Sequence, residues 1–412
     1  MESEPENTGQ SFVDELIQPE AEHAEPKPKP KDNFLPWHKP RKHWIRRNQW
    51  AAGAVDLINR LGLGGQQRPL NYISLPGPDM LDVRAIHHAC ASVGAQIQFL
   101  GFMTGEDSER TELNISLDEV LSLPGVSSES TVLLDALQSL ADPKSVGYAK
   151  AEQYGPYDII NIDLCKSVGG APPLDQQAGC YAALQRIIEL QRRKRPPEQP
   201  WLLFLTTRGN MQSVQADARA AFFDCLIRNV EKHEDIVRPA LQDGLGITPE
   251  QLALLGAGTP PAGVNFEPAF AAAVGKWILQ LLGVAPAGTL SLLPTSCFYG
   301  IRNPGMNDMI SLGFLCQTIV APAADPSGLA PAGVPQQIFP TEPEAAATMI
   351  RLVQQMQNVD VVLGQDSGTY AQAVEDAAEF MGTARFDIAA YRIWALRSKE
   401  APKETQIKAP GQ

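Results

Sequence analysis

Short apolar runs alternate with amphipathic segments through the first half of the chain. Five of these runs have the length and the flanking turn residues of β-strands: 70–75, 95–102, 131–137, 157–164 and 201–207. Segments with helical spacing lie between them, including one that ends near residue 94 and others at 116–123 and 176–193. This alternation predicts βαβ units, and therefore an α/β fold with a mainly parallel sheet.

The pattern changes after residue 210. Residues 211–285 are mostly helical, with a break rich in glycine and proline at 255–264. Two strand-like runs follow at 289–300 and 309–320, and the turn between them predicts an antiparallel pair. Helices at 345–357 and at about 369–381 complete the predicted fold.

The segment before the first strand combines proline, lysine and tryptophan. Its KPKPKP run is extended in character, because proline fixes φ and lacks an N–H. From Lys42 the spacing predicts a helix to about Leu61, with Trp44, Val55 and Ile58 on its apolar side. We therefore expect a disordered acidic tail at 1–31 and a Trp/basic arm with a helix at 32–66. The core follows at 67–210, with a helical insertion at 211–288. The late strand pair and the C-terminal helices of the core take up 289–397, and a second disordered tail takes up 398–412.

Charge is unevenly distributed along the chain. The 412 residues carry 34 Lys and Arg against 47 Asp and Glu, a net charge of −13, which excludes a uniformly basic surface for nucleic acid. Residues 1–26 hold eight acids and no Lys or Arg, whereas residues 27–47 hold eight bases and one acid. The local basic stretch therefore keeps a nucleic-acid partner open.

The basic residues of the arm stand among tryptophans, and two interpretations stay open. The bases could bind phosphates while the tryptophans stack on nucleobases. Alternatively, the tryptophans anchor the arm on the main domain, and the bases stay solvated or pair with the acidic body. The residues concerned are Lys39, Arg41, Lys42, Trp44, Arg46 and Arg47.

Composition narrows the class of protein further. Hydrophobic residues make up 44% and charged residues 20%, as in a soluble globular protein. No run of about 18 apolar residues predicts a membrane-spanning helix, and the first residues lack the features of a signal peptide. The six cysteines are scattered without a CxxC pair, which favours a reducing cytoplasm and gives no reason to expect a metal.

Residues able to bind a ligand or transfer a proton follow the predicted strands. In order and in these local features, residues 70–320 resemble the class I AdoMet-dependent methyltransferases, which have a Rossmann-like sheet with an antiparallel edge strand. The resemblance implies that the loop after the first strand approaches S-adenosylmethionine (AdoMet). It also implies that an acid after the second strand holds the ribose of AdoMet and that an Asp after the third strand lies near its adenine. Residues just after the fourth strand would carry the chemistry. In this chain these positions are Pro76, Gly77 and Asp79, then Glu106 or Asp107, then Asp135, then Asp163.

The match departs from the family in two places. The first loop has one glycine, Gly77, where the family usually has two or three, and Pro76 and Pro78 remove two backbone donors. The fourth strand is not followed by an NPPY-type tetrapeptide or a Pro-Cys pair. Amino methylation of the familiar DNA type and methylation of cytosine C5 are therefore disfavoured.

Structural roles compete with the chemical ones. Asp163 could act as a base or cap the following turn, and Asp79 could meet a cofactor amino group or cap the following helix. Cys165 lacks a neighbouring base in the sequence, which favours an inert thiol. Arg208, at the end of the fifth strand, is the candidate anion contact of the core, and its alternative is an ion pair with a surplus acid.

Two functions stay open at this point. The first is a divergent AdoMet-dependent methyltransferase, which could act on nucleic acid. The second is a non-catalytic adaptor of the same fold that binds nucleic acid or a partner protein. The chain also resembles accessory proteins of bacterial mobile-element and phage-defence clusters, some of which carry divergent methyltransferase-like domains.

Overall fold

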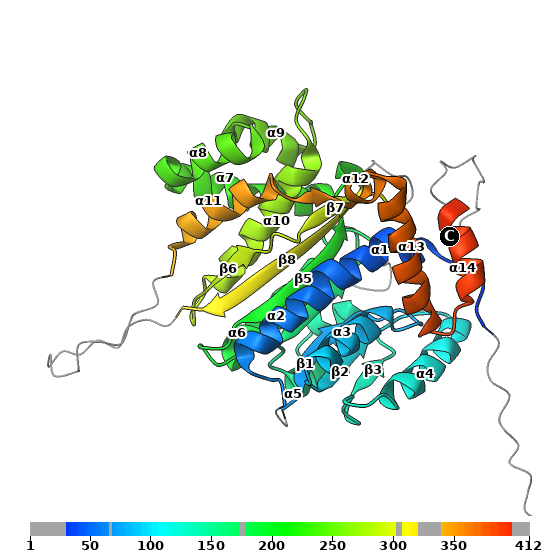
Figure 1. Cartoon of the computed structure of the whole chain (residues 1–412). Helices are drawn as coiled ribbons and strands as arrows, with labels where there is room; N and C mark the ends of the chain where they lie inside the picture. The colour runs from blue at the N-terminus through cyan, green and yellow to red at the C-terminus, as the bar shows by residue number, and fades with distance from the viewer. Residues whose placement is uncertain (1–29, 66–67, 173–177, 302–306, 320–338, 398–412) are drawn as a thin grey trace, which may run out of the picture.

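A central sheet organises the molecule (Figure 1). The computed structural model describes residues 30–65, 68–172, 178–301, 307–319 and 339–397. Within them the strands form one sheet in the order β3-β2-β1-β4-β5-β8-β7-β9, with β6 paired to β8. The five predicted parallel strands are confirmed as β1 (Leu70–Ser74), β2 (Ile97–Phe102), β3 (Thr131–Leu133), β4 (Ile159–Asp163) and β5 (Trp201–Arg208). The molecule therefore has the predicted α/β, Rossmann-like class.

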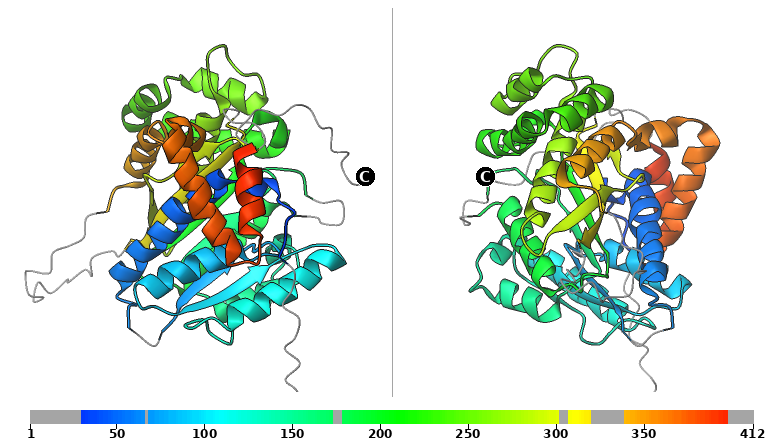
Figure 2. Two further views of the ribbon diagram at one scale, coloured as in Figure 1. Left: turned by 45° about the vertical axis from the view of Figure 1, so that its right-hand side comes forward. Right: turned by 90° about the vertical axis from the view of Figure 1, so that its left-hand side faces the viewer.

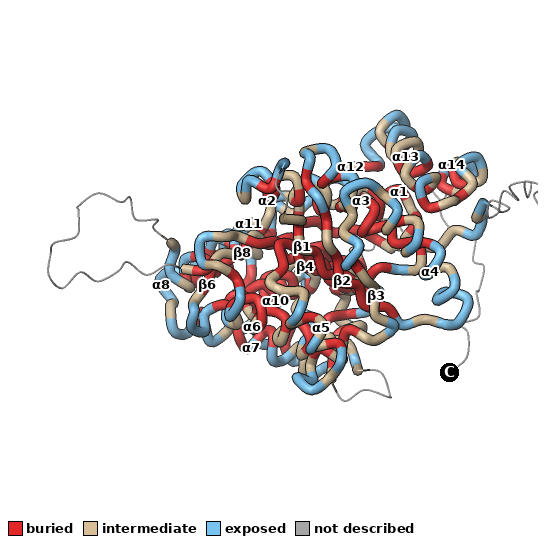
Figure 3. Tube along the Cα trace, turned by 90° about the horizontal axis from the view of Figure 1, so that it is seen from below, coloured by how far each residue is buried: buried red, intermediate tan, exposed pale blue. Residues whose placement is uncertain are grey.

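The strand order reverses between β1 and β4, which are neighbours in the middle of the sheet. From β1 the chain builds outward through β2 to β3, and it then returns to place β4 and β5 on the other side. Figure 3 shows these central strands as buried in the middle of the molecule. In open α/β sheets, ligands bind outside the carboxyl ends of the strands at such a reversal.

The late strands form the antiparallel part of the sheet. β8 (Met309–Thr318) pairs antiparallel with β5 along its length. The predicted partner strand is confirmed but is broken into β6 (Gly288–Leu292) and β7 (Cys297–Tyr299), both antiparallel to β8. At the break, the Ser296 hydroxyl accepts the N–H of Gly313, which replaces a ladder bond. The short β9 (Gln357–Asn358) is parallel to β7.

Helices cover both faces of the sheet, as the two views in Figure 2 show. One face carries α2 (Ala52–Leu61), α3 (Leu81–Ser92), α4 (Asp107–Leu121), α12 (Val359–Gly364), α13 (Ser367–Gly382) and α14 (Ile388–Arg397). The other carries α5 (Val146–Tyr154), α6 (Cys180–Lys194), α7 (Ala216–Lys232), α8 (Glu234–Leu245), α9 (Pro249–Ala257), α10 (Phe266–Leu282) and α11 (Glu342–Val353). Among the described residues, no helix is long and apolar enough to span a membrane.

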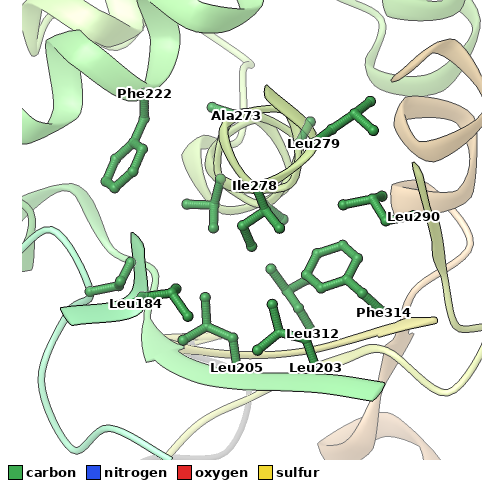
Figure 4. Packing of buried hydrophobic residues seen from close by; sticks show 14 of the residues in the cluster. Leu184, Leu203, Leu205, Phe222, Ala273, Ile278, Leu279, Leu290, Leu312 and Phe314 are labelled. Carbon is green, nitrogen blue, oxygen red and sulfur yellow. The ribbon is translucent and has the colours of Figure 1, made fainter. Parts of the chain in front are cut away.

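Alternation along the strands divides the core into two clusters. Leu203 of β5 faces one cluster, whereas Phe204 faces the other, because successive strand side chains point to opposite faces. Figure 4 shows Ile278 of α10 pointing toward Leu312 and the other apolar side chains of β5 and β8. α10 lies in the range predicted as a helical insertion, yet it packs directly on the sheet.

The helix predicted from Lys42 begins slightly earlier and changes type in its middle. It comprises α1 (Pro40–Ile45), a π-helical turn η2 (Arg46–Ala51) and α2. The wider π turn shifts the phase of the side chains around the axis. The fully buried positions are therefore Ile45, Trp50, Ala54, Leu57 and Ile58, whereas the predicted Trp44 and Val55 are only half-buried.

The predicted helix at 116–123 is wrong in its start. α4 begins at Asp107, and Glu106 is its N-cap. Glu109 accepts the N–H of Glu106 in a capping box, so the acid-rich DSER segment starts a helix instead of extending the loop after β2. β3 is shorter than predicted and ends at Leu133.

Candidate functional site

A cavity of about 450 Å³ lies at the carboxyl ends of β1 to β4. Its wall includes the loop after β1, the end of β2, the segment after β3 and the turn after β4. The predicted Pro76, Gly77, Asp135 and Asp163 all line it. Residues from three distant parts of the sequence thus meet at the edge where the parallel strands end, and we call this space the large cavity.

The β1–α3 loop approaches the sheet closely at one point and opens at another. A Cβ on Gly101 of β2 would lie 2.7 Å from the Pro76 ring, so glycine is needed there for the loop to pass. At Gly77, by contrast, an added Cβ would meet no heavy atom within 4 Å. Met80 has a φ of 51° and turns the chain into α3. The loop thus leaves open space at the position where it faces the large cavity.

A second cavity, of about 140 Å³, lies beside the first, and we call it the small cavity. It shares Leu75, Gly77, Pro78, Asp163 and Cys165 with the large cavity. Its other walls come from the arm and from the start of α3: Trp37, Arg46, Asp79, Met80, Leu81 and Asp82. The arm thus contributes to the site, which the sequence pattern did not indicate.

Arg46 lines the small cavity, and one of its N–H donors has no hydrogen-bond partner among the described residues. Its residue is 4% exposed, and both terminal nitrogens donate to the Trp37 carbonyl at 3.2 Å. The Nε atom has no hydrogen-bond partner within the described structure. Leaving a buried donor without a partner costs about 1–3 kcal/mol. The Arg46 residue lines the small cavity, although its Nε atom has no accessible surface there.

Asp163, the candidate catalytic residue, is held by the arm. Its Oδ1 atom accepts from Lys42 Nζ at 2.6 Å. The ammonium group also lies 4.6 Å from the centre of the Trp50 ring, within the range of a cation–π contact. Burial lowers the pKa of Lys42, and Asp163 acts in the opposite direction. The Asp163 side chain is 24% exposed, so it remains accessible from the cavities.

Asp79 does not line the large cavity and faces the small one. Lys31 Nζ lies 2.5 Å from Asp79 Oδ1, and His38 Nε2 lies 3.2 Å from Oδ2. Burial alone would raise the pKa of Asp79, but His38 and Lys31 hold it below its usual value. Asp79 is not the N-cap of α3, which was the structural alternative for this residue, because the N-cap is Met80.

The two other predicted cofactor contacts differ in their positions. Asp135 lines the large cavity and accepts the N–H of Ala136 at 2.7 Å. Glu106 is exposed and caps α4, whereas Glu109, one turn later, lines the cavity. Sequence reasoning missed Glu109 because the start of α4 was placed too late.

Three basic residues of the arm are buried. Arg41, Lys42 and Arg46 are each at most 6% exposed. Arg41 pairs with Asp360 at 3.0 Å and donates to the Gly300 carbonyl. This arrangement matches the anchoring interpretation, although here the bases are buried with their partners.

The remaining predicted contacts lie nearer the surface. The side chain of Arg47 is 61% exposed and pairs with Asp376, and Trp44 is half-buried. Lys39 donates to the Ile301 carbonyl at 3.3 Å. Arg208 donates to the Cys165 carbonyl at 2.8 Å and lies 3.3 Å from Asp308.

A nucleophilic Cys165 and a metal site are two further kinds of chemistry to consider at this edge of the sheet. Desolvation of the sulfur, together with Asp163, raises the pKa of the Cys165 thiol and disfavours a thiolate nucleophile. A search of the described residues for three or more His, Cys, Asp or Glu side chains that could hold a metal ion found none.

Comparisons with known proteins were made for the whole chain. A family model described as PP_RS20740-like matches residues 31–396, and a search of curated proteins found no match. Among solved structures, the chain is similar to a SAM-dependent methyltransferase from Agrobacterium tumefaciens, with 12% identity, a TM-score of 0.31, and 70% of this chain and 63% of that one covered. It is also similar to the plantazolicin methyltransferase BpumL in complex with SAH, with 9% identity, a TM-score of 0.30, and 68% and 87% covered.

The strand order by itself places the chain in the Rossmann-like α/β class. The chain spans 63% of the length of the first of these structures.

Proposed function

We propose that the chain, which belongs to the PP_RS20740-like family, binds AdoMet in the two joined cavities and transfers its methyl group to an acceptor beside Asp163. The observation that carries this proposal is that the Gly77 turn and Asp163 line both cavities. The site lies at the reversal of strand order, where open α/β sheets bind their ligands.

The two cavities suit the two ends of AdoMet. The large cavity, about 450 Å³, has the size of a small-molecule site. It would take the nucleoside, with the Asp135 carboxylate as an acceptor for the adenine amino group and Glu109 as an acceptor for ribose hydroxyls. The small cavity would take the amino-acid end, whose carboxylate would accept from Arg46 Nε.

Asp163 and Lys42 would prepare the acceptor. Bound AdoMet supplies an electrophilic methyl group. Asp163 would accept a hydrogen bond from the N–H or O–H of the acceptor and take its proton as the new bond forms. Lys42 holds one carboxylate oxygen at 2.6 Å, so the orientation of Asp163 is set before an acceptor arrives.

The test of the ligand site uses two neighbouring arginines. Binding of S-adenosylhomocysteine (AdoHcy), the demethylated product, should raise the melting temperature of the wild-type protein at about 1 mM ligand. Arg46→Met should reduce that shift, because it removes the Nε donor from the small cavity. Arg47→Met is the control, since Arg47 does not line the small cavity. Equal shifts in both variants would contradict the placement of the amino-acid end.

One observation favours a second candidate, a non-catalytic protein of the same fold. Pro76 and Pro78 leave the β1–α3 loop without two N–H donors, so the loop offers fewer backbone contacts to a ligand. Such a protein would bind a partner without transferring a methyl group. Ligand binding without turnover on any acceptor would favour this candidate.

The nature of the acceptor remains a prediction. Arg41, Lys42 and Arg46 make internal contacts, so a nucleic acid would have to meet the outer basic residues, such as Lys39, Arg47 and Arg208. A partner protein, a cytoplasmic location and a role in phage defence or mobile elements likewise stay predictions from the sequence.

A further inference from the structure

Three buried side chains from three elements form a continuous hydrogen-bonded chain that ends at the small cavity. Asn161 Nδ2 of β4 donates to Tyr72 Oη of β1 at 2.9 Å. The Tyr72 hydroxyl donates in turn to Asp82 Oδ2 of α3 at 3.0 Å. Asn161 and Tyr72 are fully buried and Asp82 is 7% exposed, and Asp82 lines the small cavity.

The direction of this chain is fixed by its donors. The Asn161 amide N–H can only donate, so the Tyr72 oxygen accepts from it and its proton points to Asp82. Burial raises the pKa of Tyr72 well above its usual value, so its hydroxyl keeps the proton. Asp82 is thereby held in the wall of the small cavity by a permanent donor.

Asp82 also differs from the other aspartates of the small cavity in its partners. Asp79 is paired with Lys31 and His38, and Asp163 is paired with Lys42. Asp82, by contrast, accepts from a neutral hydroxyl, that of Tyr72. Among the acids that line the small cavity, Asp82 is therefore the one without an ion pair within 4 Å in the described part of the chain, and a ligand ammonium group would supply one.

We propose that Asp82 binds the ammonium group of the ligand's amino-acid end, and that Tyr72 and Asn161 are positioning residues that hold its carboxylate in the cavity wall. This inference rests on the proposed function, because it assigns a role within the same ligand site. Arg46 would bind the carboxylate of the same amino-acid end, so the two residues together would recognise a zwitterion.

The hydrogen bond from Tyr72 should also set the pH range of binding. Burial raises the pKa of Asp82, whereas the bond from Tyr72 opposes that rise. The charged groups that face Asp82 are Arg46 from η2, Asp163 after β4 and Asp79 in the loop. Removing the hydroxyl favours protonated Asp82, so binding of an ammonium group should fail at a higher pH than in the wild type.

The experiment compares two ligands and three variants of the full chain by calorimetry. AdoHcy carries the amino-acid end, and 5′-methylthioadenosine has the same nucleoside and thioether without it. Tyr72→Phe and Asp82→Asn should each weaken AdoHcy binding by about tenfold and leave methylthioadenosine binding unchanged. In Tyr72→Phe the acid limit of AdoHcy binding should move to higher pH.

Tyr157→Phe is the matched control for the loss of a buried hydroxyl. Tyr157 is 1% exposed, and its hydroxyl donates to the Ala151 carbonyl at 2.8 Å, away from the cavities. This variant should bind both ligands as the wild type does. If Tyr72→Phe and Asp82→Asn lost the same affinity for both ligands, or lost no affinity for AdoHcy, the role of Asp82 would be overturned and the proposed function would stand. A wild-type protein that binds neither ligand would overturn the proposed function and this inference together.

Discussion

Lys42 of the arm and Asp163 at the end of β4 form an ion pair of 2.6 Å that joins the N-terminal segment to the candidate site. The Lys42 side chain is 5% exposed and lies over the face of Trp50. Removing one partner of a buried pair leaves the other charge without compensation. The pair therefore makes the arm part of the site as well as part of the core.

This pair predicts a coupled effect on stability. Lys42→Met should lower the free energy of unfolding by about 2–4 kcal/mol, somewhat less than for a fully buried pair because Asp163 is partly exposed. The double variant Lys42→Met/Asp163→Asn should be less destabilised than the sum of the two single variants. Urea unfolding of the four proteins measures the coupling, and strictly additive effects would contradict the proposed dependence.

The arm as an anchor predicts a contrast between two arginines. Arg41→Ala should cost about 3 kcal/mol, because it breaks a buried pair with Asp360 and a bond to a carbonyl. Arg47→Ala should cost no more than about 1 kcal/mol, because its pair with Asp376 is exposed. Urea unfolding checks both values. Similar small losses in the two variants would favour an arm that is free to meet another molecule.

Gly101 predicts a link between the sheet and the first loop. An alanine Cβ there would lie 2.7 Å from the Pro76 ring, so Gly101→Ala should displace the loop, cost about 1–3 kcal/mol and weaken AdoHcy binding. Gly364→Ala is the control, since a Cβ at Gly364 meets no heavy atom within 4 Å. Denaturation and calorimetry measure the two effects. Unchanged ligand affinity in Gly101→Ala would remove the loop from the site.

His43 predicts sensitivity to acid. Burial lowers the pKa of His43 to about 3. Below about pH 6.5, the His43 imidazole is therefore protonated in the unfolded chain and stays neutral in the folded chain. Stability should therefore fall as the pH drops below about 6.5, by up to about 1.4 kcal/mol per pH unit from this residue. His43→Phe keeps a ring against Phe380, whose centre lies 4.8 Å away, and should flatten this slope. An unchanged slope between pH 4.5 and 6.5 would contradict the assignment, with the exposed His88→Gln as control.

The sheet and part of the site could be predicted from the sequence because both depend on local pattern. Apolar runs define β1 to β5, and the residues that follow a parallel strand must lie at one edge. This reasoning places Gly77, Asp135 and Asp163 together, and all three line the large cavity. Glu106 does not line the large cavity, because a capping box starts α4 at this point and brings Glu109 to the wall instead.

The contribution of the arm could not be predicted in the same way. A π turn within one helix changes which side chains face the core, and no residue pattern marks such a turn. Arg46 therefore faces the small cavity while Arg47, its neighbour, faces solvent. The partners of the buried bases are also remote in the sequence, as with Arg41 and Asp360.

Calorimetric titration of the whole chain with AdoHcy tests most directly whether the two cavities bind AdoMet. We expect saturable binding of one ligand per chain and a matching rise in melting temperature. The absence of both heat and a thermal shift at millimolar AdoHcy would contradict this expectation.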